Sequence, residues 1–212
     1  MPLLKTWEED NGQWGIWHVT ETPEELRTCL SDATVTQELE ELKAPSRKLE
    51  YLAVRVLLKA MWGREVRIGH ESSGKPFLWN EPCRISISHT KNYVAVGLHA
   101  TASPGIDIER YGERVRKVAS RFVREDEMPG RECMEAQDEL YQLLLHWSAK
   151  ETMFKVLDCR EVDFLQHLKV GPFQLDSSGT FRGESFRLER EQCFAIHYLI
   201  HPEFVCTYCI DT

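Results

Sequence analysis

The stretch Gly105-Ile106-Asp107-Ile108-Glu109 alternates apolar and acidic side chains with the period of two that is typical of a β-strand. Ile106 and Ile108 then point to one face, and Asp107 and Glu109 point to the other. Two carboxylates this close repel each other, and each is pushed toward its neutral form unless a cation lies between them or water separates them. The stretch predicts a strand in one of two settings: a divalent-cation site, or a solvent-facing edge strand, which alternation alone favours.

A third acid lies on a helix that the spacing predicts near residues 137–157. Ser148, Glu151 and Lys155 form one line along this helix, and apolar residues flank the line on both sides, so the helix is expected to be buried nearly all round. A Glu and a Lys four residues apart stabilise a helix by roughly 0.2–0.5 kcal/mol, but this explains an exposed pair better than one between apolar flanks. A partly buried Glu is stable when it binds a metal ion, and a nearby Lys can then meet a phosphate oxygen.

The three acids offer carboxylate oxygens without any His or Cys. Magnesium is bound by a few carboxylates and keeps positions for water and substrate phosphate. The sequence therefore indicates a Mg2+ site formed by Asp107, Glu109 and Glu151, with Lys155 beside it.

Two earlier segments offer groups that could bind an anion. Ser72-Ser73-Gly74-Lys75-Pro76 is a turn with backbone amides and an ammonium group, and Ser86-Ile87-Ser88-His89-Thr90 lies at a strand end. Each segment alone is weak evidence for an anion site, because a Gly-Lys-Pro turn is common in loops and a lone His is more often structural. Residues 43–75, however, hold eight Lys or Arg against three Glu, or +5, in a chain of net charge −8. The negative net charge disfavours nucleic-acid binding, whereas a local basic patch suits a small polyanion.

The composition, 42% hydrophobic and 28% charged, is that of an ordinary globular protein, and no apolar run is long enough to span a bilayer. Residues 1–11 carry charges where a signal peptide needs an apolar core. The seven cysteines, Cys159 among them, are scattered, and Cys206 and Cys209 are expected on opposite strand faces, which disfavours a zinc or redox pair. These features predict a cytoplasmic protein with reduced thiols and no membrane association.

Strands and helices are intermixed without a regular repeat, which predicts an α+β fold rather than a doubly wound sheet. In order, the pattern predicts a strand at 14–19, a helix capped by Thr22, a helix capped by Ser46 and ended by Gly63, a hairpin of strands 84–88 and 93–98, the strand 105–109, helices near 113–122 and 137–157, and strands to the end. The small, polar linker 100–104 is the expected boundary between subdomains 1–101 and 102–212.

The chain resembles the 4'-phosphopantetheinyl transferases over residues 47–155. The resemblance rests on an ordered set of motifs: Arg47, Gly74-Lys75-Pro76, Ser88-His89, Gly105-Ile106-Asp107-Ile108-Glu109 and Trp147-Ser148-x-Lys150-Glu151-x-x-x-Lys155. The last two motifs are similar to the signature pair of the family. One position departs from the family pattern: Thr152 stands where members usually have a smaller Ala or Ser, which is expected to affect packing only.

In length the chain is similar to the larger, surfactin-type class rather than the short trimeric class. That resemblance implies a monomer of two similar α+β subdomains about a pseudo-twofold axis, with the coenzyme in the cleft between them. It further implies that subdomain 1–101 contacts the phosphates of coenzyme A and that subdomain 102–212 holds the metal.

The activity that the resemblance implies is transfer of 4'-phosphopantetheine from coenzyme A to a serine of an apo acyl or peptidyl carrier protein, with release of adenosine 3',5'-bisphosphate. Mg2+ held by Asp107, Glu109 and Glu151 would bind the pyrophosphate. Glu151 and Lys155 are the expected catalytic residues, with metal-bound water or Glu127 as alternatives to Glu151 as the general base. The residues expected to contact the coenzyme are Arg47, Gly74, Lys75, Pro76, Ser88, His89 and Lys155.

Two other functions remain open at this point. The first is an inactive module of the same fold that binds coenzyme A or a carrier without turnover, although the complete set of acids argues against it. The second is another metal-dependent phosphoryl-transfer enzyme such as a nuclease, which the acidic remainder of the surface disfavours. Nothing in the sequence distinguishes a carrier of fatty-acid, polyketide or peptide synthesis.

Overall fold

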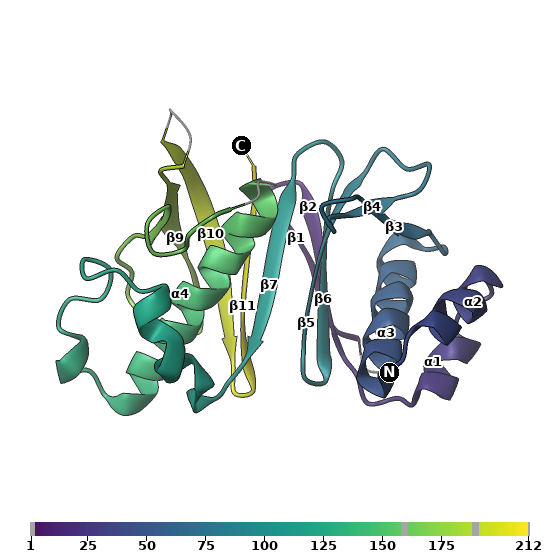
Figure 1. Ribbon diagram of the computed structural model, residues 1–212, viewed down its shortest axis with the longest axis horizontal. Helices are drawn as coiled ribbons and strands as arrows, with labels where there is room; N and C mark the ends of the chain where they lie inside the picture. The colour runs from purple at the N-terminus through teal and green to yellow at the C-terminus, as the bar shows by residue number, and fades with distance from the viewer. Residues whose placement is uncertain (1–2, 158–160, 188–190, 212) are drawn as a thin grey trace. The chain divides into compact units, whose positions relative to one another are not determined.

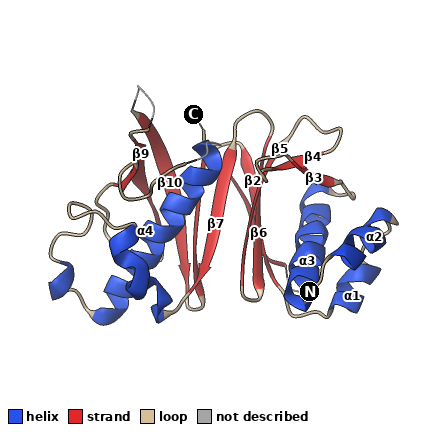
Figure 2. Cartoon of the chain, viewed as in Figure 1, coloured by secondary structure: helices blue, strands red, loops and turns tan. Residues whose placement is uncertain are grey.

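The computed structural model describes residues 3–157, 161–187 and 191–211 (Figure 1). The chain divides into two compact units, Met1–Thr101 and Ala102–Thr212, here called the N-terminal and C-terminal units. The division falls inside the small, polar segment 100–104. Each unit combines helices with antiparallel sheet, as Figure 2 shows by colour, so the α+β prediction is confirmed.

The N-terminal unit contains a four-stranded antiparallel sheet in the order β1-β2-β6-β5 and a separate β3–β4 pair. Its strands are β1 (Leu3–Glu9), β2 (Gly12–His18), β3 (Ile68–His70), β4 (Pro76–Leu78), β5 (Arg84–Thr90) and β6 (Tyr93–His99). Its helices are α1 (Pro23–Thr28), α2 (Thr34–Glu41) and α3 (Pro45–Trp62). The buried side of α3 packs with β2, β5 and β6 into one apolar core.

Local sequence signals set several ends of these elements. Thr22 and Glu25 form a reciprocal capping box at the start of α1, as the sequence predicted for Thr22. Gly63, with a φ of +79°, ends α3 as predicted, because glycine tolerates the left-handed conformation. The predicted cap at Ser46 is wrong: the N-cap is Ala44, two residues earlier, and α3 begins at Pro45, whose fixed φ and missing N–H suit the first turn.

The C-terminal unit contains a five-stranded antiparallel sheet in the order β7-β11-β10-β9-β8. Its strands are β7 (Pro104–Arg110), β8 (Leu168–Val170), β9 (Ser178–Ser185), β10 (Gln192–His201) and β11 (Phe204–Ile210). The 22-residue helix α4 (Ala136–Leu157) lies across one face of this sheet (Figure 1), and two short 3-10 helices, η1 (Glu113–Arg121) and η2 (Arg131–Cys133), precede it.

Helix α4 lies very close to the sheet. A Cβ added at Gly105 of β7 would be 2.5 Å from the carbonyl oxygen of Thr152, and one at Gly183 of β9 would be 2.7 Å from Sδ of Met153. A side chain at Gly105 would push the helix backbone away, whereas one at Gly183 would displace the end of the Met153 side chain. Because α4 and β7 carry the predicted catalytic residues, this close approach decides how the site is built.

The remaining structural expectations concern cysteines and the membrane. Cys206 and Cys209 are both buried on β11, and the six cysteines that the structure describes carry free thiols, while Cys159 lies outside the described residues. Among the described helices, none combines the length and the apolar character needed to cross a bilayer.

Candidate active site

Strand β7 presents Asp107 and Glu109 on the same face, and α4 packs against this strand. In the pairing of β7 with β11, Asp107 lies opposite Thr207 and Glu109 lies opposite Val205. β7 is the edge strand of its sheet, but Asp107 is only 4% exposed, so this face of the strand does not point to solvent as alternation alone favoured. A buried carboxylate needs a compensating partner.

Helix α4 supplies that partner and one more acid. The Nζ of Lys155 donates to Oδ1 of Asp107 at 2.8 Å and to the carbonyl oxygen of Ile106 at 2.8 Å. Glu151 lies one turn before Lys155 on the same helix, which places both side chains on the same side of α4. The structure therefore groups Asp107, Glu109, Glu151 and Lys155 at the contact of β7 with α4.

The site carries more negative charge than Lys155 compensates. Burial, and then the charge of Asp107, raise the pKa of Glu151 to about 7. Burial, and then Asp107, also raise the pKa of Glu109 to about 7, although the Trp147 indole opposes that shift. Both Glu carboxyl groups would be ionised more readily beside a cation.

The donor set fits a hard divalent cation such as Mg2+, because it consists of carboxylate oxygens, and burial and the charge of Asp107 raise the pKa values of two of the three carboxyl groups. Asp107, Glu109 and Glu151 are not among the described groups whose ligand atoms all lie within 4.8 Å of one another. Their side chains must therefore rotate inward to close on an ion.

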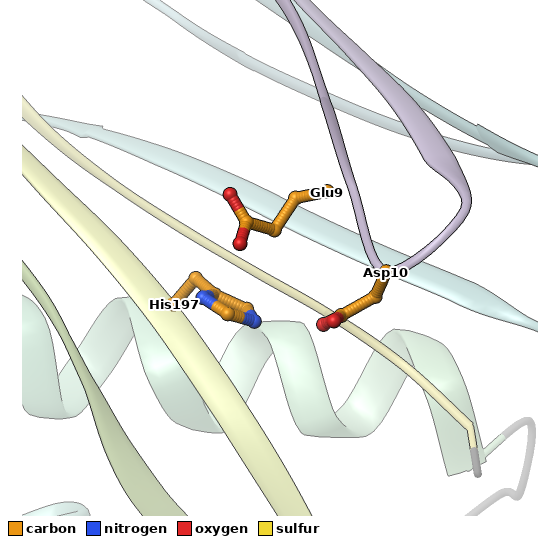
Figure 3. Close-up of side chains that lie close together, drawn as sticks. All are labelled: Glu9, Asp10 and His197. Carbon is orange, nitrogen blue, oxygen red and sulfur yellow. The ribbon is translucent and has the colours of Figure 1, made fainter.

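Figure 3 draws another set of potential ligands: Glu9 at the end of β1, Asp10 in the turn that follows, and His197 of β10. Glu9 and Asp10 belong to the N-terminal unit, and His197 belongs to the C-terminal unit. Within its own unit, His197 Nδ1 lies 3.0 Å from the Thr180 hydroxyl, and its ring stacks on Tyr208.

Trp147 holds Glu109 from the helix side. Its Nε1 donates to Oε1 of Glu109 at 2.8 Å. Its indole ring packs against the rings of Phe122 and Phe164, with centroids 5.1 and 5.6 Å away. A ring packed by two others has little freedom to turn, so the direction of its N–H is fixed toward Glu109.

The other signature lysine, Lys150, is structural. It is fully buried, and its Nζ donates to the carbonyl oxygens of Phe122, Phe164 and Leu168 at 2.6, 3.1 and 2.9 Å. It also pairs with the equally buried Glu127 at 2.8 Å. Lys150 therefore ties down the backbone of the two phenylalanines that pack against Trp147.

Glu127 is fully committed to this network. Its carboxylate accepts hydrogen bonds from the backbone N–H groups of Arg124 and Val170, at 2.6 and 2.7 Å, in addition to the pair with Lys150. A carboxylate with no exposure and with these partners cannot reach a substrate hydroxyl. The structure thus argues against Glu127 as the general base.

The predicted anion-binding residues lie in the N-terminal unit, and the structure brings two of them together. Nη1 of Arg47 lies 3.0 Å from Nε2 of His89 and 3.1 Å from Oε2 of Glu50. Arg47 is 60% exposed at its side chain. Ser88 is buried, on the opposite face of β5 from His89, so its hydroxyl does not join them.

The Gly74-Lys75-Pro76 segment forms a turn before β4. Gly74 has a φ of +91°, and its N–H donates to the carbonyl oxygen of Glu71 at 2.9 Å. The N–H of Lys75 donates to the Ser73 hydroxyl at 3.3 Å. These bonds use two of the amides that the sequence offered to an anion.

The basic segment 43–75 is largely paired within its own unit. At least five of its eight cations form ion pairs with acids within the described residues: Arg47, Arg55, Lys59, Arg64 and Arg67. Arg55 in addition stacks on Tyr51, 3.3 Å from the ring centroid. The local surplus of charge is therefore weaker than the composition indicated.

Sequence reasoning did not anticipate three contacts of this site: the Trp147–Glu109 bond, the Lys150–Glu127 pair, and a bond between Thr152 and Thr207. Trp147 is four residues before Glu151, so helical spacing could have placed it near the acids. A lone Thr in a strand such as Thr207 gives no such signal.

The fold and the site together define a class of protein: an α+β protein whose grouped acids suit a divalent cation and whose lysine suits a phosphate group. A family model described as the 4'-phosphopantetheinyl transferase superfamily matches residues 103–209, and the chain belongs to this superfamily. It is accordingly a transferase of the phosphopantetheinyl type. A comparison with curated proteins finds no match.

The matched residues include Asp107, Glu109, Glu151 and Lys155. Arg47, Lys75 and His89 precede the matched range, so the family assignment says nothing about them.

Proposed function

We propose that this protein transfers 4'-phosphopantetheine from coenzyme A to a serine of an apo acyl or peptidyl carrier protein, with Mg2+, and releases adenosine 3',5'-bisphosphate. The observation that carries the proposal is the group of three acids and one lysine at the contact of β7 with α4, inside the range that matches the family.

In this reaction the serine oxygen attacks the β-phosphorus of coenzyme A, and the bond between that phosphorus and the bridging oxygen breaks. Mg2+ held by Asp107, Glu109 and Glu151 would offset the charge that gathers on the pyrophosphate as it breaks. Lys155, whose ammonium is 2.8 Å from Asp107, would support the same phosphates.

Glu151 is our candidate for the group that accepts the serine proton. Its pKa of about 7 lies near neutral pH, where a general base is most effective. Coordination to the metal would lower that pKa, so a metal-bound water remains the alternative acceptor. The burial of Glu127 and its pair with Lys150 argue against the other alternative.

Arg47, Gly74, Lys75, Pro76, Ser88 and His89 are proposed to contact the phosphates of the coenzyme. The proximity and exposure of Arg47 and His89 support this most directly. A phosphate that binds there must displace Glu50 from Arg47. Ser88 has the least support, because its side chain is buried.

We also propose that the chain belongs to the larger, surfactin-type class, with two similar subdomains about a pseudo-twofold axis, and acts as a monomer. In support, each unit has an antiparallel sheet with one long helix packed against it, α3 in the first and α4 in the second.

The test is incubation of the protein with coenzyme A, Mg2+ and a panel of apo carriers, followed by mass measurement of the carrier. We expect a carrier to gain phosphopantetheine, and Asp107→Asn and a chelator each to prevent the gain. No gain on any acyl or peptidyl carrier would contradict the proposal. Binding of coenzyme A without transfer would instead indicate an inactive module of the same fold.

A further inference from the structure

Three hydroxyl groups form a buried chain between α4 and β11. Ser148 and Thr152 of the helix and Thr207 of the strand are all 0% exposed. Oγ1 of Thr207 lies 2.9 Å from Oγ of Ser148 and 2.7 Å from Oγ1 of Thr152. Thr152 also donates to the carbonyl oxygen of Thr207 at 3.2 Å.

One arrangement of protons satisfies all three groups. Each hydroxyl has a single proton to donate. In this arrangement, Ser148 would donate to Thr207 and Thr207 to Thr152, two bonds in which either oxygen can be the donor, while Thr152 donates to the backbone carbonyl of Thr207. The chain is then complete, so no hydroxyl is buried without a bond.

The chain connects the two halves of the acid site. Ser148 and Thr152 are one helical turn apart, and Glu151 lies between them in the sequence. Thr207 is the residue of β11 that lies directly opposite Asp107 of β7. The three hydroxyls therefore join the turn of helix that carries Glu151 to the strand pair that carries Asp107.

Apolar packing alone would not fix this position. The close approach at Gly105 sets how near α4 lies to β7. Apolar contacts have no preferred direction, however, and resist sliding of the helix along the sheet only weakly. Hydrogen bonds have a preferred length and angle, so a chain of them across the contact resists sliding and rotation.

Burial of these three hydroxyl groups is also unfavourable by itself, which calls for an explanation. Burial of a hydroxyl among apolar groups is unfavourable unless it is bonded, whereas Val in place of Thr would carry no such cost. Thr152 is, in addition, the one position of the helix motif that departs from the resemblance to the family. Its bonds to Thr207 show that its effect is not limited to packing.

We propose that Ser148, Thr152 and Thr207 are positioning residues that set the place of Glu151 relative to Asp107, and thereby the affinity of the acid site for a divalent cation. The inference rests on the metal site of the proposed function, but not on the identity of the carrier or on turnover.

The experiment measures binding of Mn2+ to the purified full-length protein by electron paramagnetic resonance, with Thr207→Val and Thr207→Ser as the variants. Val keeps the shape and loses the hydroxyl, whereas Ser keeps the hydroxyl. We expect Thr207→Val to weaken Mn2+ binding by about 10-fold or more, the effect typical of partners that orient metal ligands. Thr207→Ser should retain wild-type affinity within about twofold, which amounts to rescue by the conservative variant.

Tyr198→Phe is the matched control. The Tyr198 hydroxyl is also buried in the C-terminal unit, where it donates to the carbonyl oxygen of Gln174 at 3.1 Å and accepts from the N–H of Asp176 at 3.2 Å. It has no bond to the acids or to α4 among these contacts. Its loss should lower the melting temperature, as Thr207→Val does, and leave Mn2+ affinity unchanged.

The outcomes separate this inference from the proposed function. Equal Mn2+ affinity in wild type and Thr207→Val overturns the positioning role, even if carriers are modified. Weaker binding in Thr207→Val alone supports it, even if no carrier is modified. Absence of Mn2+ binding by the wild type overturns it together with the metal site. If Thr207→Val does not fold, Ser148→Ala, which removes one bond at the end of the chain, replaces it under the same criteria.

Discussion

Asp107 affects every other charged group of the site. It accepts a bond from Lys155, and its charge raises the pKa of both Glu109 and Glu151. A single buried carboxylate thus keeps one cationic side chain in place and makes two more carboxyl groups costly to ionise. The combined negative charge of these carboxylates would favour binding of a divalent cation more than any one of them alone.

The pH dependence of stability follows from these pKa values. Glu109 and Glu151 each have a pKa of about 7 in the folded protein, against an ordinary value of 4.5. Between these values the folded state binds more protons than the unfolded state, so without a divalent cation stability falls as pH rises from about 4.5 to about 7. A cation that binds these carboxylates, as proposed, would compete with those protons and bind more tightly as pH rises.

We therefore predict that Mg2+ raises the melting temperature more at about pH 8 than at about pH 5.5. Thermal unfolding with and without Mg2+ at both values measures the effect. The double variant Glu109→Gln, Glu151→Gln is the control and should lose the response at both. An equal shift at the two pH values in the wild type would show that these carboxyl groups do not bind the ion.

The elements that the sequence predicted best are those with the strongest local patterns. Strand β7 and helix α4 follow from alternation and helical spacing. Thr22 marks the start of α1 and Gly63 marks the end of α3, as expected. Strand β1 and helix α2 were not predicted, because β1 is mostly exposed and α2 has few apolar positions. Weak burial gives weak periodicity, so such elements depend on tertiary contacts.

The site was predictable to the extent that its chemistry is local. Asp107 with Glu109, and Glu151 with Lys155, follow from spacing within one strand and one helix. That Lys155 bonds Asp107, or that Thr207 bonds Thr152, depends on which strands meet α4. Such pairings join residues about fifty positions apart, and one sequence holds no record of them.

The buried Lys150–Glu127 pair holds elements together. Lys150 joins α4 to Phe122 and Glu127, which precede the helix in the sequence, and to Leu168, which follows it. We predict that Lys150→Met destabilises the protein by about 3–5 kcal/mol, since it leaves Glu127 charged and uncompensated in the interior. The double variant with Glu127→Leu should recover part of this loss. Urea unfolding measures both.

Lys169→Met is the control for that experiment. Lys169 pairs with Asp126 at 2.6 Å in the same unit, but both side chains are substantially exposed. An exposed pair contributes little, so this variant should unfold near the wild-type urea concentration. Equal effects of Lys150→Met and Lys169→Met would show that the buried pair is not a structural anchor.

At the scale of the whole molecule, the proposed function assigns different tasks to the two units. The acids of the C-terminal unit lie within the residues that match the family, whereas Arg47 and His89 of the N-terminal unit do not. The first group would stabilise charge that develops as the phosphate bond breaks, and the second would bind phosphates of the coenzyme that are already charged. Kinetics separates these tasks, because only the first is specific to the transition state.

We therefore predict that Arg47→Ala raises KM for coenzyme A by roughly tenfold with little change in kcat, because it removes a charge-assisted contact made equally in the ground and transition states.

Asp107→Asn should instead lower kcat by roughly 100-fold or more, since a metal ligand is lost while the side chain keeps its size. Arg64→Ala is the control for Arg47→Ala. It removes another exposed arginine of the basic segment, which pairs with Glu81, and should change neither KM nor kcat. A KM rise of the same size in Arg64→Ala would mean that general positive charge, and not the Arg47–His89 pair, attracts the coenzyme. A fall of kcat in Arg47→Ala would place Arg47 at the reacting phosphate and move the boundary between the two tasks.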